Sequence, residues 1–286
     1  MEYLMTYGWA ILVIAVVLGV LYSLGIFSPS NFAPKAQPGS CQVFRPNGPA
    51  TSYNINLEGV CSDELPEYVG EFMANSMLTV PYNRLFFSNP NAVTVSAWIY
   101  LPSSLPAPYR GIIGFAACCV SGAYDMIIEV NQPHVGFEVV SSTGTRYYEN
   151  PNVENPTGTW VNYIGTYNGT SGNVTVYIDG KRYTSNGNPA NVISGVTNNL
   201  IIGGGNGATE FPGAIANVQI YNISVGSTAA DYLYNEGIGG APVDLQHLVG
   251  WWPLNGNAND YSGNNNNGEP IYVSYSGTWQ GGYTSP

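Results

Sequence analysis

The sequence predicts a mainly β protein, in which an N-terminal hydrophobic α-helix precedes an antiparallel β-sandwich. Three observations predict this fold class: short runs of alternating apolar and polar residues, abundant Gly and Pro (35 and 20 residues), and a long uncharged stretch at the start of the chain. Alternation with a period of two is typical of strands with one buried face. We divide the chain into a helix at 1–28, a Pro-rich linker and neck at 29–69, and a sandwich at 70–286.

The composition excludes one class of partner. Charged residues make up 9% of the chain, and 18 acidic against 7 basic residues give a formal net charge of −11. Binding to nucleic acid depends on neutralising phosphates with Lys and Arg, so a chain of this charge is repelled. We therefore expect no nucleic-acid partner.

The hydrophobic stretch covers residues 8–27, GWAILVIAVVLGVLYSLGIF, which contain no charge. A helix of this length spans about 30 Å, the thickness of the hydrocarbon layer of a membrane. Ser28 and Pro29 end the helix, and an ordinary membrane anchor is one interpretation. A cleaved secretory signal peptide fits less well, because the first 34 residues contain no Lys or Arg.

The opening MEYLMTYGWAILVIAVV resembles the class III signal segment of archaeal type IV pilin-like proteins, and Glu2-Tyr3-Leu4 matches the motif of that family. In the family a peptidase removes a short basic leader, the mature helices bundle into a filament core, and the C-terminal domains coat the outside. The resemblance implies a membrane location before assembly and an extracellular filament at the cell surface afterwards. Here the Glu is second rather than fifth, so either translation starts upstream or the chain is trimmed.

The same resemblance gives residues of the helix a role in self-assembly. An acid at a helix N-terminus is favoured by the macrodipole, and in a water-poor bundle Glu2 also needs a cationic partner. In the family a neighbour's terminal amine is thought to be that partner, so Glu2 is expected to set the register of a helical homo-oligomer; the alternative is that it sits in headgroup water. Gly8, Ala15 and Gly19 are small residues at which helices can approach closely.

The clearest strand patterns are at 92–101 (AVTVSAWIYL), 173–183 (NVTVYIDGKRY) and 214–222 (AIANVQIYN). Asp179-Gly180 predicts the two-residue turn of a hairpin, which requires positive φ at both positions. We therefore expect Asp179 to be structural.

The order of these runs is similar to that of the laminin-G-like, concanavalin-like jelly rolls. The pieces that carry the similarity are VTVSAWIY, GTWVNYIGTYNGTSGNVTVYIDGK, LIIGGGNG, FPGAIANVQIYN and the helical tail STAADYLYNEG. We expect Trp98 and Trp160 to be buried in the sandwich, each with a partner for its N–H group, rather than stacked on sugar. By analogy, the resemblance also implies lectin-like binding of carbohydrate by the head, for which Tyr147 and Tyr148 are weak candidates.

The segment LVGWWPLNGNANDYSGNNNNG at 248–268 resembles the piece that opens such domains, yet here it comes last. We expect a permuted fold, in which this segment returns as a strand beside the start of the sandwich. In a filament, the alternative is that the strand is donated to a neighbouring subunit, since chain termini often lie close together.

Cysteines and sequons point to modification outside the cell. Disulfides are expected, with three pairings open; Cys41 with Cys61 is favoured, and the adjacent pair forms either a vicinal disulfide or separate bonds to the neck. The four cysteines are Cys41, Cys61, Cys118 and Cys119. Sequons for N-glycosylation begin at Asn168, Asn173 and Asn222.

We expect no catalysis. Glycosidases with this fold need two carboxylates about 5 to 10 Å apart, which on one strand would stand two or four residues apart. No such pair occurs: Glu129 and Glu138 stand alone between apolar residues. The two histidines, His134 and His247, suggest no triad and no zinc site, and no Gly-rich phosphate loop follows a strand.

One loop suggests a cation. ANDYSGNNNNG places Asp260 among amide and backbone oxygens, with Asn257 close by, and these ligand types suit structural calcium. The other interpretation is an Asn-Gly turn with a capped Asp. Taken together, the sequence predicts a filament subunit that displays a jelly-roll head for adhesion. The alternative is a singly membrane-anchored, lectin-like carbohydrate-binding protein at the cell surface.

Overall fold

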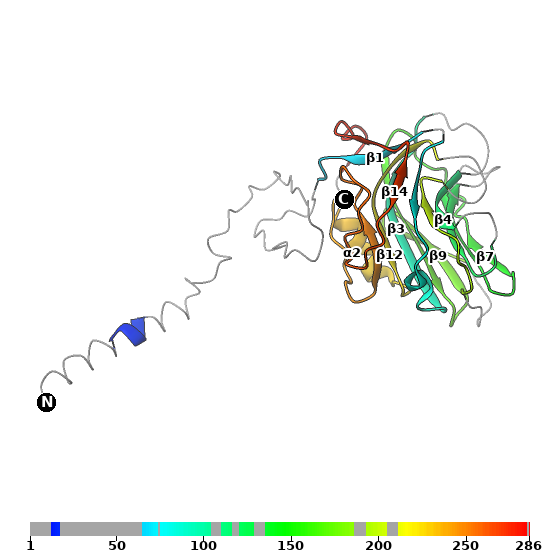
Figure 1. The fold of residues 1–286 in the computed structure, drawn as a ribbon, viewed down its shortest axis with the longest axis horizontal. Coiled ribbons are helices and arrows are strands. Elements are labelled where there is room, and N and C mark those ends of the chain that lie inside the picture. The colour runs from blue at the N-terminus through cyan, green and yellow to red at the C-terminus, as the bar shows by residue number, and fades with distance from the viewer. Residues whose placement is uncertain are drawn as a thin grey trace, which may run out of the picture. The chain divides into compact units, whose positions relative to one another are not determined.

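The computed structural model describes residues 13–17, 65–73, 75–103, 110–115, 120–128, 135–185, 193–204, 211–284 and 286. From residue 65 onward they belong to one compact unit, a sandwich of two antiparallel sheets (Figure 1). The predicted antiparallel β-sandwich is confirmed.

The sandwich contains fifteen strands, one 3-10 helix and one α-helix among its described residues. In chain order these are β1 (Val69–Phe72), β2 (Met77–Val80), η2 (Arg84–Phe87), β3 (Ala92–Tyr100), β4 (Arg110–Phe115), β5 (Tyr124–Ile128), β6 (Val135–Val140), β7 (Arg146–Glu149), β8 (Trp160–Asn168), β9 (Asn173–Ile178), β10 (Lys181–Thr184), β11 (Leu200–Ile202), β12 (Gly213–Tyr221), α2 (Ser227–Asn235), β13 (Leu248–Trp252), β14 (Glu269–Ile271) and β15 (Ser274–Ser276).

The first sheet has the strand order β10-β9-β8-β3-β12-β1-β15, with β13 also paired to β12. Strand β1 pairs with the start of β12 and β13 with its end, so the two short strands follow one another along the same side of β12. The second sheet has the order β14-β2-β11-β4-β5-β6-β7. Below they are called sheet A and sheet B.

The main core lies between the two sheets and follows from the period of two along each strand. In β3, for example, Val93, Val95, Ala97 and Ile99 are at most 1% exposed and belong to this core. The side chains between them face outward, away from sheet B.

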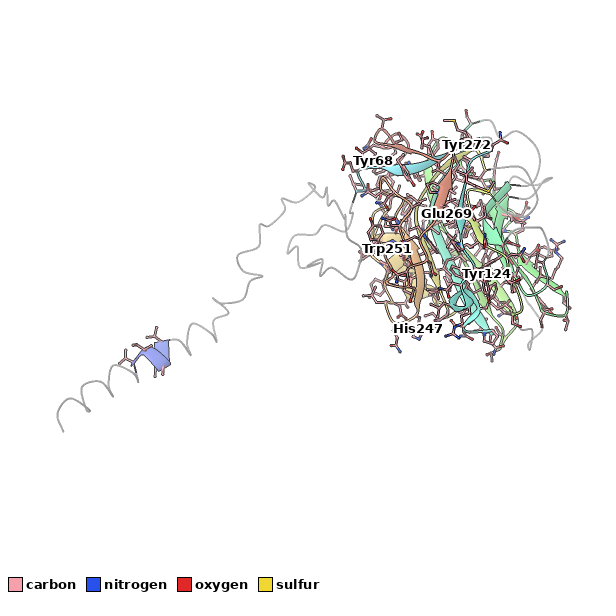
Figure 2. The ribbon with its side chains drawn as sticks, viewed as in Figure 1. Tyr68, Tyr124, His247, Trp251, Glu269 and Tyr272 are labelled. Carbon is pink, nitrogen blue, oxygen red and sulfur yellow. The ribbon has the colours of Figure 1, made fainter. Side chains whose placement is uncertain are left out.

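Helix α2 covers part of the outer face of sheet A. Its buried residues Ala230 and Leu233 join a second apolar cluster with Tyr221 and Trp251, which come from β12 and β13. Trp251 is labelled in Figure 2. The helical tail predicted from the sequence is confirmed.

The end of the chain completes both sheets. Strand β14 pairs with β2, β15 pairs with β1, and β13 pairs with β12, all within the same chain. The prediction that the C-terminal segment returns beside the start of the sandwich is therefore confirmed in outline. It was wrong in one detail, because 248–268 contributes only β13, whereas the strands that touch β1 and β2 come from 269–276.

The predicted hairpin forms between β9 and β10. Asp179 and Gly180 have φ values of 46° and 75°, as a two-residue turn of this kind needs. One Asp179 carboxylate oxygen accepts a hydrogen bond from the Asn162 N–H at 2.8 Å. Asp179 is structural, as expected.

Within the predicted N-terminal helix, the structure describes residues 13–17, which are helical. Four aliphatic side chains of this turn are about half exposed: Val13, Ile14, Val16 and Val17. Among the described residues, no helix combines the length and hydropathy that crossing a membrane requires. The rest of the predicted helix and the linker up to residue 64 lie outside the described residues.

Replacing Trp252 by Ala tests how much the returning C-terminal segment contributes to stability. Its ring is fully buried in the main core, and its Nε1–H donates to the Asn266 carbonyl at 2.8 Å. We expect a loss of about 3–5 kcal/mol in the free energy of unfolding of the full chain, measured in urea. As a control, Tyr272→Ala, at a side chain 82% exposed (Figure 2), should change it by no more than about 0.5 kcal/mol. Equal midpoints for the two variants would show that this segment is not part of the core.

Candidate functional site

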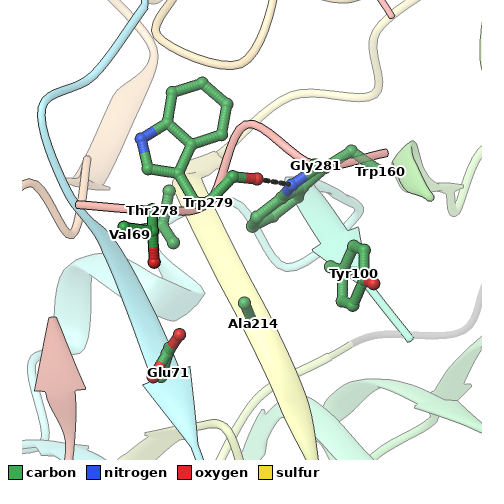
Figure 3. Close-up of a pocket in the computed structure, with 8 residues that line it drawn as sticks. All are labelled: Val69, Glu71, Tyr100, Trp160, Ala214, Thr278, Trp279 and Gly281. Carbon is green, nitrogen blue, oxygen red and sulfur yellow. Dashed lines mark hydrogen bonds between the residues drawn. The ribbon is translucent and has the colours of Figure 1, made fainter. Parts of the chain in front are cut away.

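A cavity of about 250 Å³ opens on the outer face of sheet A, beside the C-terminal segment (Figure 3). Aromatic and small side chains form most of its wall. The described residues that line it are Val69, Glu71, Tyr100, Trp160, Ala214, Thr278, Trp279 and Gly281.

Strand register brings four of these residues into one row across the sheet. Glu71 of β1 lies opposite Ala214 of β12, Ala214 lies opposite Tyr100 of β3, and Tyr100 lies opposite Trp160 of β8. Directly opposite residues on neighbouring strands point to the same face. The small Ala214 leaves a gap between the Glu71 carboxylate and the Tyr100 ring, and this gap is the floor of the cavity.

The C-terminal segment supplies the opposite wall and is held in place by hydrogen bonds. The Trp160 Nε1–H donates to the Trp279 carbonyl at 3.0 Å, and the Trp279 Nε1–H donates to the Pro66 carbonyl at 3.1 Å. The rings of Trp160 and Trp279 meet edge to face, with centroids 6.1 Å apart. The Trp160 backbone N–H also donates to the Gly282 carbonyl at 2.9 Å. The wall is therefore fixed before any ligand arrives.

The cavity has a simple electrostatic character. Glu71 is the one ionisable acid among the described lining residues, and no Lys or Arg is among them. The Thr278 hydroxyl adds a further polar group. A site of this kind combines aromatic surface with a few polar groups that fix orientation, as ligand pockets generally do.

A second groove, of about 260 Å³, lies elsewhere on the outer face of sheet A. Hydroxyl and amide side chains form most of it, together with Arg182 and the sequon residues Asn168 and Asn173. Among its described lining residues Tyr177 is aromatic, whereas the first cavity is lined by Tyr100, Trp160 and Trp279. The aromatic cavity is the better candidate for a ligand with apolar faces.

The family model Laminin_G_3, described as the concanavalin A-like lectin/glucanases superfamily, matches residues 72–229. The match covers more than half of the chain. The chain belongs to this family. The predicted laminin-G-like, concanavalin-like jelly roll is thus confirmed, and the sandwich is called the laminin-G-like domain from here on.

Several solved structures are similar to this chain at low sequence identity. A protein from Bacteroides ovatus ATCC 8483 whose proposed role is carbohydrate binding has a TM-score of 0.57 and 16% identity; the match covers 74% of this chain and 60% of that protein. Domain 4 of AbnA, a GH43 extracellular arabinanase from Geobacillus stearothermophilus solved with arabinotriose, has a TM-score of 0.43 and 21% identity, covering 52% and 69%. A heptameric SAP-like pentraxin from Limulus polyphemus has a TM-score of 0.41 and 16% identity, covering 58% and 81%. A search of curated proteins finds no match.

The two tryptophans singled out in the sequence are buried, but they do not lie between the sheets. Trp98 and Trp160 are 2% and 5% exposed and belong to a third cluster on the outer face of sheet A. Trp98 stacks on Tyr234 of α2, and its Nε1–H has no hydrogen-bond partner among the described residues, so that part of the prediction was wrong. Trp160 has its partner and also lines the cavity, a role that its expected place in the core did not suggest.

Asp260 holds together the loop in which it lies. Its Oδ1 accepts hydrogen bonds from the N–H groups of Trp251 and Ser262, at 2.9 and 2.8 Å. Its Oδ2 accepts from the Ser262 hydroxyl and the Asn266 N–H, both at 2.8 Å. These bonds describe a capped Asp in a turn, the second of the two interpretations. Both amide atoms of Asn257 are also engaged: its nitrogen donates to the Tyr261 hydroxyl, and its oxygen accepts from the Asn259 N–H.

Calcium at this loop stays a prediction. Among the residues that the structure describes, no group of three or more His, Cys, Asp or Glu side chains is placed to hold a metal ion. A cation at Asp260 would have to displace or share the four hydrogen bonds that its carboxylate already accepts. His247, in the same part of the domain, bonds through Nδ1 to the Asp244 carboxylate at 2.7 Å.

The sequons differ in their surroundings. Asn168 is exposed, and its side-chain oxygen accepts from the N–H groups of Thr170 and Ser171, which leaves its amide nitrogen outside these bonds. Asn173 is half-buried at the start of β9. The Asn222 amide nitrogen donates to the Ser88 hydroxyl at 3.0 Å, so a glycan there would break that bond.

Several predicted residues lie outside the part of the chain that the structure describes. These are the assembly residues Glu2, Gly8 and Gly19, the four cysteines, Glu129 and His134; Ala15 falls within the helical residues 13–17. Of the two tyrosines proposed to stack on sugar, Tyr148 is 56% exposed and Tyr147 packs against the main core.

The sequence suggested that Glu138 stands alone, and this was wrong. It lies directly opposite Asp125 on the neighbouring strand, and both carboxyl groups are buried. The residues are thirteen positions apart in sequence, so a search along single strands could not pair them. The register between β5 and β6 is what brings them together.

Replacing Asp260 by Asn distinguishes a loop-stabilising carboxylate from a calcium ligand. An Asn side chain has a single oxygen, so part of the four hydrogen bonds is lost, and we expect a destabilisation of about 1–3 kcal/mol. The loss should be the same in calcium and in chelator, measured by urea unfolding of the full chain. A loss seen only with calcium present would assign the carboxylate to a metal site instead.

Proposed function

We propose that the chain is a subunit of an extracellular pilin-like filament, and that its laminin-G-like domain binds carbohydrate for adhesion. The observation that carries the binding role is the cavity between Glu71, Tyr100 and the two tryptophans. The filament role rests on the resemblance of the N-terminus to pilin-like signal segments.

The chemistry of the cavity suits a sugar ring. A pyranose presents apolar C–H groups on its faces and hydroxyl groups around its rim. Aromatic rings can pack against the faces, while a carboxylate and a hydroxyl accept hydrogen bonds from the rim. Tyr100 and Trp160 offer the aromatic surface here, and Glu71 and Thr278 offer the polar groups.

The charge of the site narrows the class of sugar. The described lining residues include one acid and no base, and the whole chain has a net charge of −11. Sugars that carry carboxylate or sulfate groups would be repelled. We therefore propose that the site takes neutral or amino sugars, bound as a single ring, because the cavity is small.

The presence of one carboxylate among the described lining residues favours sugar binding over hydrolysis of a glycosidic bond. Hydrolysis of a glycosidic bond usually needs two carboxyl groups that flank it. Glu71 is the one carboxylate among the described residues of the cavity. Carbohydrate binding is also the role proposed for the Bacteroides ovatus protein that shares the fold.

The filament role is supported by the apolar surface of residues 13–17. Val13, Ile14, Val16 and Val17 are each at least 50% exposed, and such a surface needs lipid or other helices to cover it. In the archaeal type IV pilin-like proteins that the N-terminus resembles, copies of the same helix cover this apolar surface once the subunits leave the membrane and assemble. The alternative is a singly anchored surface protein with the same carbohydrate-binding head.

The carbohydrate site is tested by glycan-array binding of the full chain and of a Glu71→Gln variant. We expect binding to neutral or amino oligosaccharides, weakened about tenfold in the variant, because a hydrogen bond to a charged acceptor contributes about 1.5–3 kcal/mol. Glu269→Gln, at an exposed carboxylate on sheet B, is the matched control and should bind like the native chain. Native-like binding by Glu71→Gln, or binding to acidic sugars alone, would contradict the proposed site.

The filament role is tested by electron microscopy of cells that produce the chain. We expect helical fibres at the cell surface, and their loss in Glu2→Ala, because the helix then has no acid to pair with a neighbour's amine. Glu2→Asp keeps the charge and should retain some fibres. A membrane-held monomer without fibres, still able to bind glycan, would favour the singly anchored alternative.

A further inference from the structure

A pair of buried acids lies on the outer face of sheet B. In β5, the side chains of Tyr124, Met126 and Ile128 face the main core, so Asp125 points to the other side of the sheet. Glu138 lies directly opposite Asp125 on β6, where Cβ atoms are about 4.5–5.5 Å apart. The two side chains are 1% and 2% exposed. Two carboxyl groups therefore share one site out of contact with bulk water.

Gly114 makes room for this pair. It lies opposite Asp125 on β4, and a Cβ atom added there would stand 2.0 Å from Asp125 Oδ1. The same Oδ1 accepts a hydrogen bond from the Phe115 N–H at 3.0 Å. This hydrogen bond fixes the Asp125 carboxyl group against β4 and engages Oδ1 alone, so Oδ2 takes no part in it.

Each acid keeps one oxygen without a partner. Arg146 of β7 donates through a guanidinium nitrogen to Glu138 Oε2, forming an ion pair. Glu138 Oε1 and Asp125 Oδ2 have no hydrogen-bond partner in the described structure, although both are buried. A buried oxygen that lacks a partner costs about 1–3 kcal/mol. Because the two unpartnered oxygens belong to neighbouring side chains, one added hydrogen atom between them could satisfy both.

Charge counting leads to the same conclusion. Among the described residues, two ionised carboxylates and the Arg146 guanidinium leave one negative charge uncompensated at a buried site, which is strongly unfavourable. A single proton removes that charge. If it sits on Asp125 Oδ2 and the O–H donates to Glu138 Oε1, one hydrogen bond also satisfies both unpartnered oxygens.

We propose that Asp125 and Glu138 form a proton-binding site, in which one buried proton joins Asp125 Oδ2 to Glu138 Oε1 and links the stability of the laminin-G-like domain to external pH. Because Arg146 already forms an ion pair with Glu138, we assign the proton to Asp125. This site is independent of the cavity beside Glu71, which lies on the outer face of the other sheet.

Two other uses of the pair fit the observations less well. Calcium takes six to eight oxygen ligands, whereas the pair offers two unpartnered oxygens, and a charge of +2 would leave an excess positive charge beside Arg146. Hydrolysis of a glycan requires both acids to touch the glycosidic bond, and side chains only 1% and 2% exposed do not reach it.

The pKa of Asp125 gives the direction of the pH effect. Burial raises the pKa of Asp125 to about 8. The hydrogen bond from the Phe115 N–H and the charge of Arg146 lower this pKa, whereas the charge of Glu138 raises it. Among the described residues, Tyr148 of β7 lies directly opposite Glu138 and is a further titratable group on this face. The unfolded chain releases the Asp125 proton near the ordinary value of about 4. The contribution of this proton to stability is complete below about pH 4 and is lost progressively as the pH rises to about 8.

The test compares the full chain with Asp125→Asn, whose amide mimics the protonated acid and can donate to Glu138. We expect the two proteins to unfold at similar urea concentrations near about pH 4, and the variant to become the more stable one as the pH rises to about 8. Above that pH the difference should stay constant. Asp231→Asn, at an exposed carboxylate on α2, is the matched control and should not alter the pH dependence of the native chain.

A second measurement uses the native chain, so it does not require that the Asp125→Asn variant folds. Infrared spectra of the native chain at neutral pH should contain the carbonyl stretch of a protonated carboxylic acid, which disappears as the pH passes about 8. A native pH dependence that Asp125→Asn leaves unchanged, or no protonated acid at neutral pH, would overturn the proposal. Stabilisation by added calcium or sodium that is absent in Asp125→Asn would assign the pair to a cation instead.

Discussion

The laminin-G-like domain depends on the return of the chain's end to its beginning. Strands β13, β14 and β15 pair with β12, β2 and β1, so both sheets are completed by residues from the last forty positions of the chain. The returning segment also places the fully buried Trp252 in the main core. The wall of the candidate sugar site, from Thr278 to Gly281, follows directly after β15. Core, sheet edges and site are therefore coupled through one segment.

Cross-strand register is the second organising constraint, because it assembles chemistry from residues far apart in sequence. On sheet A, it aligns Glu71, Ala214, Tyr100 and Trp160 across four strands. On sheet B, it places Asp125 opposite Glu138. In each row a small residue sits beside an acid, Ala214 in the first and Gly114 in the second. The space that it leaves is used by a cavity in one case and by a carboxyl group in the other.

The local elements could be predicted because their causes are local. Alternation at 92–101 and 214–222 produced β3 and β12, and Asp179-Gly180 produced the hairpin between β9 and β10. The candidate site was not found in the same way. Trp160 was expected in the core, and neither Glu71 nor Tyr100 gave a signal, since single aromatics and acids are common in such strands. Their row became visible only with the pairing of β1, β12, β3 and β8.

The sequence by itself determined the fold class, the position of many strands, the turn at Asp179 and the return of the C-terminal segment. These follow from the period of two, from the backbone demands of tight turns and from the order of recognisable pieces. The tertiary structure alone decided that Trp98 and Trp160 lie outside the main core, that Asp260 caps its own loop, and that Asp125 meets Glu138. Each of these depends on the register between strands or on loop packing, where a shift of one residue turns every side chain to the other face.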